Sequence, residues 1–157
     1  MTEPLTVTMP NESSLEVTRV FNAPARLVWD AHTKPELVKR WLLGPEGWSM
    51  PKCEIDLRPG GDYLYGWRNA ANPDQYFEIG GTYKEITPHS EIKHSERFNG
   101  AETACVMRLR EASGRTTMTL TIEYGSKTVR DAAFATGMTT GMEASYKRLD
   151  GIAAEAA

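Results

Sequence analysis

The order of hydrophobic and polar residues divides the chain into a first strand, two short helices, a long run of strands and a final helix. Leu15, Val17 and Arg19 alternate with the positions between them, which predicts a strand that ends at Phe21. Asn22 is a residue type that caps helices, and Pro24 suits a first helical turn. We therefore expect a short helix directly after the first strand.

A second short helix is predicted by Thr33 and Glu36, which have the spacing of a capping box, and it should end before Gly44. From Lys52 the pattern changes to a period of two, which is typical of half-buried strands. Turn residues such as Pro59-Gly60-Gly61 and Asn99-Gly100 separate these strands. The predicted strands cover residues 53–57, 62–68, 75–86, 91–98, 103–110 and 116–124. The short gaps between them predict an antiparallel meander.

The last segment returns to a helical period. Thr128 and Asp131 again have capping-box spacing, and apolar or small residues then recur every three or four positions. These residues are Phe134, Met138, Gly141, Met142, Ser145, Leu149 and Ile152. The pattern predicts one long amphipathic helix. The fold class is therefore α+β, with a strongly curved antiparallel sheet gripping the long C-terminal helix.

A length of 157 residues fits a single domain. Residues 1–12 lack periodicity, and we interpret them as a flexible N-terminal leader or a first edge segment. The domain is then expected to cover residues 13–157. Hydrophobic residues make up 40% of the chain and charged residues 25%, which is enough to build an ordinary hydrophobic core.

The formal net charge of −3 provides no broad positive field, so we expect no nucleic-acid partner. Cys53 and Cys105 have neither disulfide-framework nor zinc-ligand spacing, and we interpret both as buried, reduced thiols. No segment has the length and apolar character of a membrane span or a signal core. These features predict a cytoplasmic protein with no membrane span.

Several short motifs resemble the SRPBCC superfamily, in the branch similar to the C-terminal domain of the activator of heat-shock protein 90 ATPase. The motifs are Phe21-Asn22-Ala23-Pro24-Ala25, Val28-Trp29-Asp30-Ala31, Thr33-Lys34-Pro35-Glu36, Arg40-Trp41, Glu54-Ile55-Asp56-Leu57-Arg58-Pro59-Gly60-Gly61 and Gly81-x-Tyr83-x-Glu85-Ile86. Together with Gly141 and Leu149, the resemblance covers roughly residues 13–153.

The resemblance implies a helix-grip fold, also called START-like or Bet v-like, in which sheet and helix enclose a cavity for apolar ligands. It implies no shared catalytic residue and no ligand identity. Members of the family often carry Trp after the glycine that corresponds to Gly141, whereas this chain has Met142, which gives a more adaptable lining.

Three aromatic residues, Tyr63, Tyr65 and Trp67, share one face of a predicted strand. If that face is concave, their large apolar bodies and polar tips could line a ligand pocket. They could equally fill a plain core beneath the helix. The sequence alone leaves these two interpretations open.

A second candidate lining contains flexible methionines. Phe134, Met138 and Met142 lie at helical spacing on the last helix, and Met107 and Met118 lie on late strands. Each of them could be an ordinary core residue, so the hypothesis concerns the set rather than any member. A methionine-rich wall suits a cavity that repacks around varied guests.

Glu78, His94 and Glu96 are the polar residues expected to point inward, because His94 and Glu96 are in phase with Ile92. They could bind the polar end of a ligand or act as general acid and base, or they could lie at a salt-bridged edge. No pair or cluster of His and Cys residues has metal-ligand spacing, so we expect no metal and no cofactor.

Our leading hypothesis is a binding protein for a small apolar or aromatic molecule, with Tyr63, Tyr65, Trp67, Glu78, His94, Glu96, Met107, Met118, Phe134, Met138 and Met142 as ligand-binding residues. One alternative is a protein-binding module that acts as a chaperone cofactor or in a stress response. A further alternative is a cavity enzyme of the cyclase or hydratase type. Small and aromatic residues on an edge strand allow a homodimer without requiring one.

Overall fold

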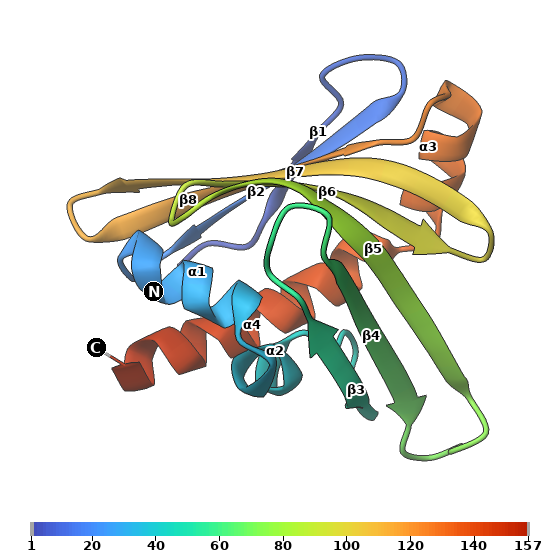
Figure 1. Ribbon diagram of the computed structural model, residues 1–157, viewed down its shortest axis with the longest axis horizontal. Helices are drawn as coiled ribbons and strands as arrows, with labels where there is room; N and C mark the ends of the chain where they lie inside the picture. The colour runs from blue at the N-terminus through green and yellow to red at the C-terminus, as the bar shows by residue number, and fades with distance from the viewer. Residues whose placement is uncertain (1, 157) are drawn as a thin grey trace.

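An eight-stranded antiparallel sheet forms the larger layer of the protein, which a computed structural model describes for residues 2–156 (Figure 1). Its strand order is β1-β2-β8-β7-β6-β5-β4-β3. The strands are β1 (Thr6–Thr8), β2 (Ser14–Phe21), β3 (Trp48–Ile55), β4 (Asp62–Asn69), β5 (Tyr76–Thr87), β6 (Glu91–Phe98), β7 (Ala101–Ala112) and β8 (Arg115–Glu123). Consecutive strands from β3 to β8 are neighbours, which confirms the predicted meander.

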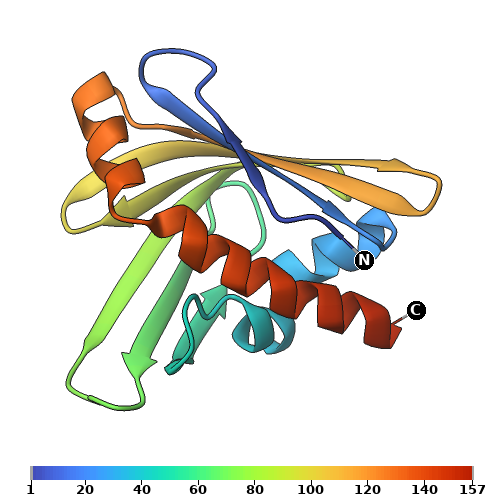
Figure 2. The ribbon, with the colours of Figure 1, turned by 180° about the vertical axis from the view of Figure 1, so that it is seen from behind.

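The helices form the second layer. Helices α1 (Ala25–Thr33) and α2 (Pro35–Trp41) follow β2, and the 19-residue α4 (Met138–Ala156) runs along the same face of the sheet (Figure 2). The short α3 (Lys127–Ala135) lies beside one end of the sheet. A curved sheet with a long C-terminal helix across it confirms the α+β helix-grip prediction.

The segment predicted as a leader or edge contains the outermost strand. Thr6–Thr8 pairs antiparallel with β2, and Val7 lies opposite Val17. Thr2 also donates a hydrogen bond of 2.6 Å to the Asp150 carboxylate on α4. The edge-segment alternative therefore describes residues 6–8, while the domain boundary at residue 12 stays a prediction.

The three predicted helix caps are wrong. Pro24 is the N-cap of α1, where the Ala25 N–H is bound by the Glu111 carboxylate at 2.7 Å. Thr33 is the last residue of α1, and its hydroxyl donates to the Trp29 carbonyl at 2.8 Å instead of capping α2. Helix α3 begins after Ser126, whose hydroxyl accepts a hydrogen bond from the Val129 N–H. The N-terminal N–H groups of α1 and α3 are thus bound by side chains other than the expected ones, and α2 has no side-chain cap.

The predicted single C-terminal helix is divided in two. Gly137 has φ +79°, and it follows the C-cap residue Thr136 of α3. Glycine adopts this left-handed conformation at little cost, so it ends α3 and lets α4 start in a new direction. The helical spacing alone could not show this break because Phe134 and Met138 remain four residues apart.

Replacing Gly137 by alanine is expected to lower the free energy of unfolding by about 1–2 kcal/mol, because a Cβ atom is strained at this positive φ. Gly151, inside α4 with open space around it, is the matched control. Gly151→Ala should instead raise stability by about 0.5–1 kcal/mol. Urea unfolding of both variants measures the difference, and an unchanged Gly137→Ala protein would contradict the helix-break argument.

A glycine in the middle of β5, Gly81, lets the Tyr63 side chain from β4 and the Ser95 carbonyl from β6 approach the β5 backbone closely. A Cβ atom at Gly81 would lie 1.9 Å from the Ser95 carbonyl oxygen and 2.6 Å from the Tyr63 ring. The missing side chain leaves room for the Tyr63 hydroxyl to donate to that carbonyl at 2.7 Å. A bend of the sheet at Gly80-Gly81 is consistent with the register shift that follows at Tyr83/Glu85.

A buried ionic network ties α4 to the first strand pair of the sheet. Arg19 on β2 is only 2% exposed, and its guanidinium binds Glu143 and Asp150 on α4, with N–O distances of 3.0 and 2.9 Å. Glu143 also accepts the Leu5 N–H at 2.8 Å. These contacts fix the helix over β2, at one side of the space that the sheet and α4 enclose.

Candidate functional site

A cavity of about 310 Å³ lies between the inner face of the sheet and α4. Helices α1 and α2, strands β4 to β8 and α4 all contribute to its wall. The lining residues are His32, Trp41, Leu42, Tyr65, Trp67, Ile79, His94, Glu96, Cys105, Met107, Met118, Leu120, Ile122, Met138, Met142, Ser145, Tyr146. Its volume lies at the lower end of the range of about 300–1,000 Å³ for small-molecule sites.

The aromatic part of the wall is held in place by hydrogen bonds to backbone carbonyls. Trp67 donates its indole N–H to the Leu42 carbonyl at 2.7 Å, and Trp41 donates to the Ala31 carbonyl at 2.8 Å. The ring of Tyr65 lies edge-on to that of Trp67, with centroids 5.9 Å apart. Because their polar atoms are already bound, the indole rings present mainly apolar surface to a ligand.

Methionines form much of the remaining wall. Met107 and Met118 come from β7 and β8, and Met138 and Met142 come from the first turns of α4. The strand methionines are almost fully buried, whereas the helix methionines are half-buried. The adaptable thioether side chains are therefore concentrated where the helix faces the sheet.

Glu96 brings a carboxylate into this mostly apolar space. Burial raises its pKa above the ordinary value. Within residues 2–156 the Glu96 side chain makes no hydrogen bond or ion pair. Every fully buried side-chain oxygen in these residues has a hydrogen-bond partner, so the Glu96 oxygens are not fully buried and contact open space at the cavity. It therefore supplies a free acceptor at the cavity wall.

Two histidines also line the cavity, and burial lowers the pKa of each, that of His32 to about 4. His32 Nδ1 lies 2.7 Å from the Val28 carbonyl oxygen. His94 Nδ1 lies 3.1 Å from both the Ser95 carbonyl oxygen and the Tyr63 hydroxyl. Because a carbonyl only accepts, both rings carry their hydrogen on Nδ1 and are neutral at pH 7, and Nε2 remains an acceptor.

The structure brings most of the predicted site residues together at this cavity. Those that line it are Tyr65, Trp67, His94, Glu96, Met107, Met118, Met138 and Met142. Tyr63 shares their strand face but is buried in the core, where its hydroxyl supports His94. Its role there is to position His94. That these residues bind a ligand stays a prediction.

Two predicted site residues lie elsewhere. Glu78 is exposed on the outer face of the sheet, where it accepts a hydrogen bond from the Tyr76 hydroxyl at 2.7 Å and lies 3.8 Å from Lys52. Strand β5 turns Phe77 and Ile79 to the other face, so the period of two places Glu78 outward. Phe134 is 40% exposed on α3, because the break at Gly137 separates it from α4.

Sequence reasoning missed several lining residues. Leu120 and Ile122 share the face of Met118 on β8, so the period of two could have found them. Tyr146 follows Met142 at helical spacing, next to Ser145, which the helical pattern had included without naming it as a ligand-binding residue. His32 and Trp41 gave no comparable signal, since their position depends on how α1 and α2 pack against α4. Cys105 is buried as expected, whereas Cys53 is only half-buried.

An outer groove of about 510 Å³ adjoins the cavity. Leu42, Trp67, Ile79, Met138, Met142 and Ser145 line both spaces. The groove also contains Trp48 and Phe77, whose rings lie 5.5 Å apart, and the Thr136-Gly137 turn between the helices. An apolar path therefore leads past the start of α4 toward the cavity.

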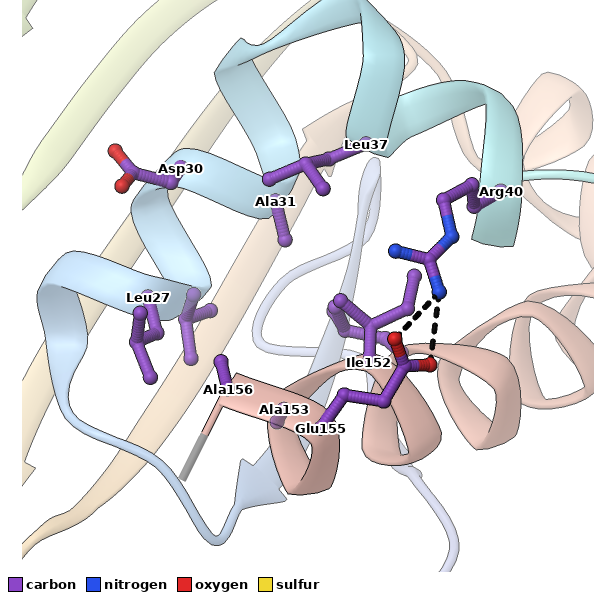
Figure 3. A pocket seen from close by; sticks show the side chains of 11 residues that line it. Leu27, Asp30, Ala31, Leu37, Arg40, Ile152, Ala153, Glu155 and Ala156 are labelled. Carbon is purple, nitrogen blue, oxygen red and sulfur yellow. Dashed lines mark hydrogen bonds and ion pairs between the residues drawn. The ribbon is translucent and has the colours of Figure 1, made fainter.

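A separate depression of about 270 Å³ lies at the other end of α4 (Figure 3). Its lining is Leu27, Val28, Asp30, Ala31, Leu37, Arg40, Leu149, Ile152, Ala153, Glu155, Ala156. Arg40 donates to both carboxylate oxygens of Glu155 across its edge, at 2.8 and 2.9 Å. Asp30, the remaining charged residue of this lining, lies 3.5 Å from the Lys34 ammonium, so each charged group of the depression has an ionic partner, in contrast to Glu96 in the cavity.

No group of three or more His, Cys, Asp or Glu side chains within residues 2–156 is arranged to hold a metal ion. In the same part of the chain, every helix is too short or too polar to cross a lipid bilayer.

A family comparison agrees with the arrangement of a curved sheet and a long C-terminal helix. Residues 22–154 match the family model described as Activator of Hsp90 ATPase homolog 1-like protein. The chain belongs to this family. A search of curated proteins gives no match.

Solved structures show the same fold. A protein from Rhodobacter sphaeroides is 28% identical, with a TM-score of 0.88 over 96% of this chain and 98% of that one. A protein from Nitrosomonas europaea is 25% identical, with a TM-score of 0.80 over 91% and 95%. An AHSA1-like protein from Aeromonas hydrophila, 14% identical, shares the fold with a TM-score of 0.72 over 87% and 93%. As a member of the Activator of Hsp90 ATPase homolog 1-like family, this chain has a fold that suits ligand binding or activator-like protein binding.

Proposed function

We propose that the protein binds a small hydrophobic or aromatic molecule in the cavity between the sheet and α4. The observation that carries this proposal is the 310 Å³ of interior space, walled by aromatic and methionine side chains. Moving an apolar ring from water into such a space is favourable by roughly 25 cal/mol per Å² of buried surface. The adjoining apolar groove supports an entry path at the start of α4.

The interior space also bears on the alternative of a chaperone cofactor or stress-response module. A protein that acts only through its surface is expected to have a filled interior, because empty apolar volume lowers stability. The cavity therefore supports small-molecule binding over a purely surface role. The enzyme alternative has less support, since only His94 and Glu96 of its three candidate residues line the cavity.

Titration with the neutral fluorophore N-phenylnaphthylamine tests the proposal. We expect a single saturable rise in fluorescence, reversed by competing indole. Met142→Trp should weaken this binding by about tenfold or more, because the larger ring fills part of the cavity. Met142 is half-buried between the cavity and the outer groove, so the larger ring has space and this variant is expected to fold.

The matched control is Ala154→Trp, which adds the same ring to the exposed side of α4. It should bind the fluorophore as the unmodified protein does. Absence of saturable binding, or equal binding by Met142→Trp, would contradict the proposed function.

A further inference from the structure

Among its described residues, the cavity wall contains a carboxylate but no lysine or arginine to pair with it. Glu96 is the one carboxylate among the described lining residues, and none of those residues is Lys or Arg. Its raised pKa reflects burial, without an opposing effect from a nearby cation. A buried carboxylate without a partner is unfavourable, and it gains most from a group that brings a positive charge or hydrogen-bond donors.

The two histidines of the wall also favour a ligand with hydrogen-bond donors. His94 lies two residues from Glu96 on β6, and its Nδ1 hydrogen is used by the Ser95 carbonyl and the Tyr63 hydroxyl. The Nδ1 hydrogen of His32 is used by the Val28 carbonyl. With lowered pKa values both rings are neutral and keep Nε2 as an acceptor. The imidazoles therefore add acceptors, and no positive charge, to the wall at neutral pH.

The aromatic rings favour the same kind of ligand. Trp41 and Tyr146 stack with centroids 5.9 Å apart and an interplanar angle of 25°, and both line the cavity with Tyr65 and Trp67. The faces of such rings attract cations, most strongly where water is excluded. The apolar body and the positive group of one ligand could thus both be accommodated.

From the unpaired carboxylate, the acceptor histidines and the aromatic wall, we propose that the ligand carries a protonated amine on an apolar or aromatic body, with the amine bound by Glu96. This inference rests on the proposed function and specifies its ligand class. Ligands with a carboxylate, such as fatty acids, are expected to bind poorly, because the described lining residues include no Lys or Arg and the two lining histidines are neutral at pH 7.

Three indoles with similar side chains test the ligand charge. Tryptamine carries an ammonium group, tryptophol carries a hydroxyl and indoleacetate carries a carboxylate. Displacement of N-phenylnaphthylamine at pH 7.5 should give tryptamine an affinity about 10- to 100-fold above that of tryptophol, as expected for a charge-assisted hydrogen bond. Indoleacetate should bind more weakly than tryptophol.

Glu96→Gln keeps the size of the side chain and removes its charge. We expect it to reduce the affinity for tryptamine by about tenfold or more and to leave that for tryptophol within about twofold. Glu78→Gln is the matched control, because Glu78 lies on the outer face of the sheet, and it should leave all three affinities unchanged.

The outcomes separate the two proposals. If tryptophol binds and tryptamine binds no better, or if the preference for tryptamine survives in Glu96→Gln, the amine assignment is overturned while cavity binding stands. If neither the fluorophore nor any of the indoles binds, cavity binding itself is rejected, and the amine assignment with it.

Discussion

Replacing Arg19 by methionine is expected to lower the free energy of unfolding by about 3–5 kcal/mol. The substitution keeps the length of an apolar stem but leaves Glu143 and Asp150 without their cation. Their side chains are 15% and 28% exposed, so water relieves part of the cost and the lower end of the range is expected. Urea or thermal unfolding at neutral pH measures the loss.

A triple variant separates the loss of the cation from the loss of packing. Arg19→Met combined with Glu143→Leu and Asp150→Leu removes the whole network, and replacement of a buried ion network by apolar groups is often close to neutral. We expect this variant to recover most of the lost stability. If it is as unstable as Arg19→Met alone, the unpaired carboxylates are not the cause.

The same network predicts how stability changes with acid. Burial alone would raise the pKa of Glu143, but hydrogen bonds from Arg19 and the Leu5 N–H outweigh it and hold this pKa below its ordinary value of 4.5. A carboxyl whose pKa is lower in the folded state contributes stability above its unfolded pKa and loses it as the pH falls through the folded pKa. Arg19→Met should therefore show a smaller loss of stability below pH 4.5 than the unmodified protein.

Arg19 also shows what the sequence could establish. Its alternation with Leu15 and Val17 predicted the strand, and in the structure these three residues share the buried face of β2. The partners could not be predicted, because Glu143 and Asp150 lie more than a hundred residues away on α4. Period-two patterns determine which face a residue takes, whereas contacts between distant elements depend on packing.

In the candidate site, too, the sequence predicted strand faces better than it predicted the packing of distant elements. Alternation put Tyr65 and Trp67 on one face of a strand but left open whether that face lines a pocket or a plain core. In the structure both residues line the cavity, as do Met107 and Met118. Glu78 was misplaced because its inward orientation was inferred without the register of β5, in which Gly66 lies opposite it and Trp67 lies opposite Phe77. A shift of one residue exchanges the two faces of a strand.

The helical part of the site was harder to predict. Phe134 fits the helical spacing of Met138 and Met142, yet the left-handed backbone at Gly137 turns α3 away from the cavity. The spacing of apolar residues is insensitive to one glycine, while the direction of a helix depends on it. Gly137 was the available signal, since glycine often follows the last residue of a helix.

Trp41 contributes to both the core and the cavity, and Trp41→Ala is expected to lower the free energy of unfolding by about 3–5 kcal/mol. The indole is 2% exposed, stacks on Tyr146 and lies edge-on to His32, with ring centroids 4.8 Å apart. Its removal also leaves the Ala31 carbonyl without its donor. Trp41→Phe retains an aromatic ring and loses only the N–H donor, so it should cost about 1–3 kcal/mol.

Because Trp41 forms part of the cavity wall, its removal should enlarge the space that a ligand can fill. Indole resembles the lost side chain, and a ligand that binds only the folded state stabilises it by about 2.7 kcal/mol at a concentration of 100 times its dissociation constant. Indole should therefore raise the melting temperature of Trp41→Ala more than that of the unmodified protein. An equal shift in both proteins would mean that the space left by the indole collapses, so that Trp41 supports the core without setting the size of the cavity.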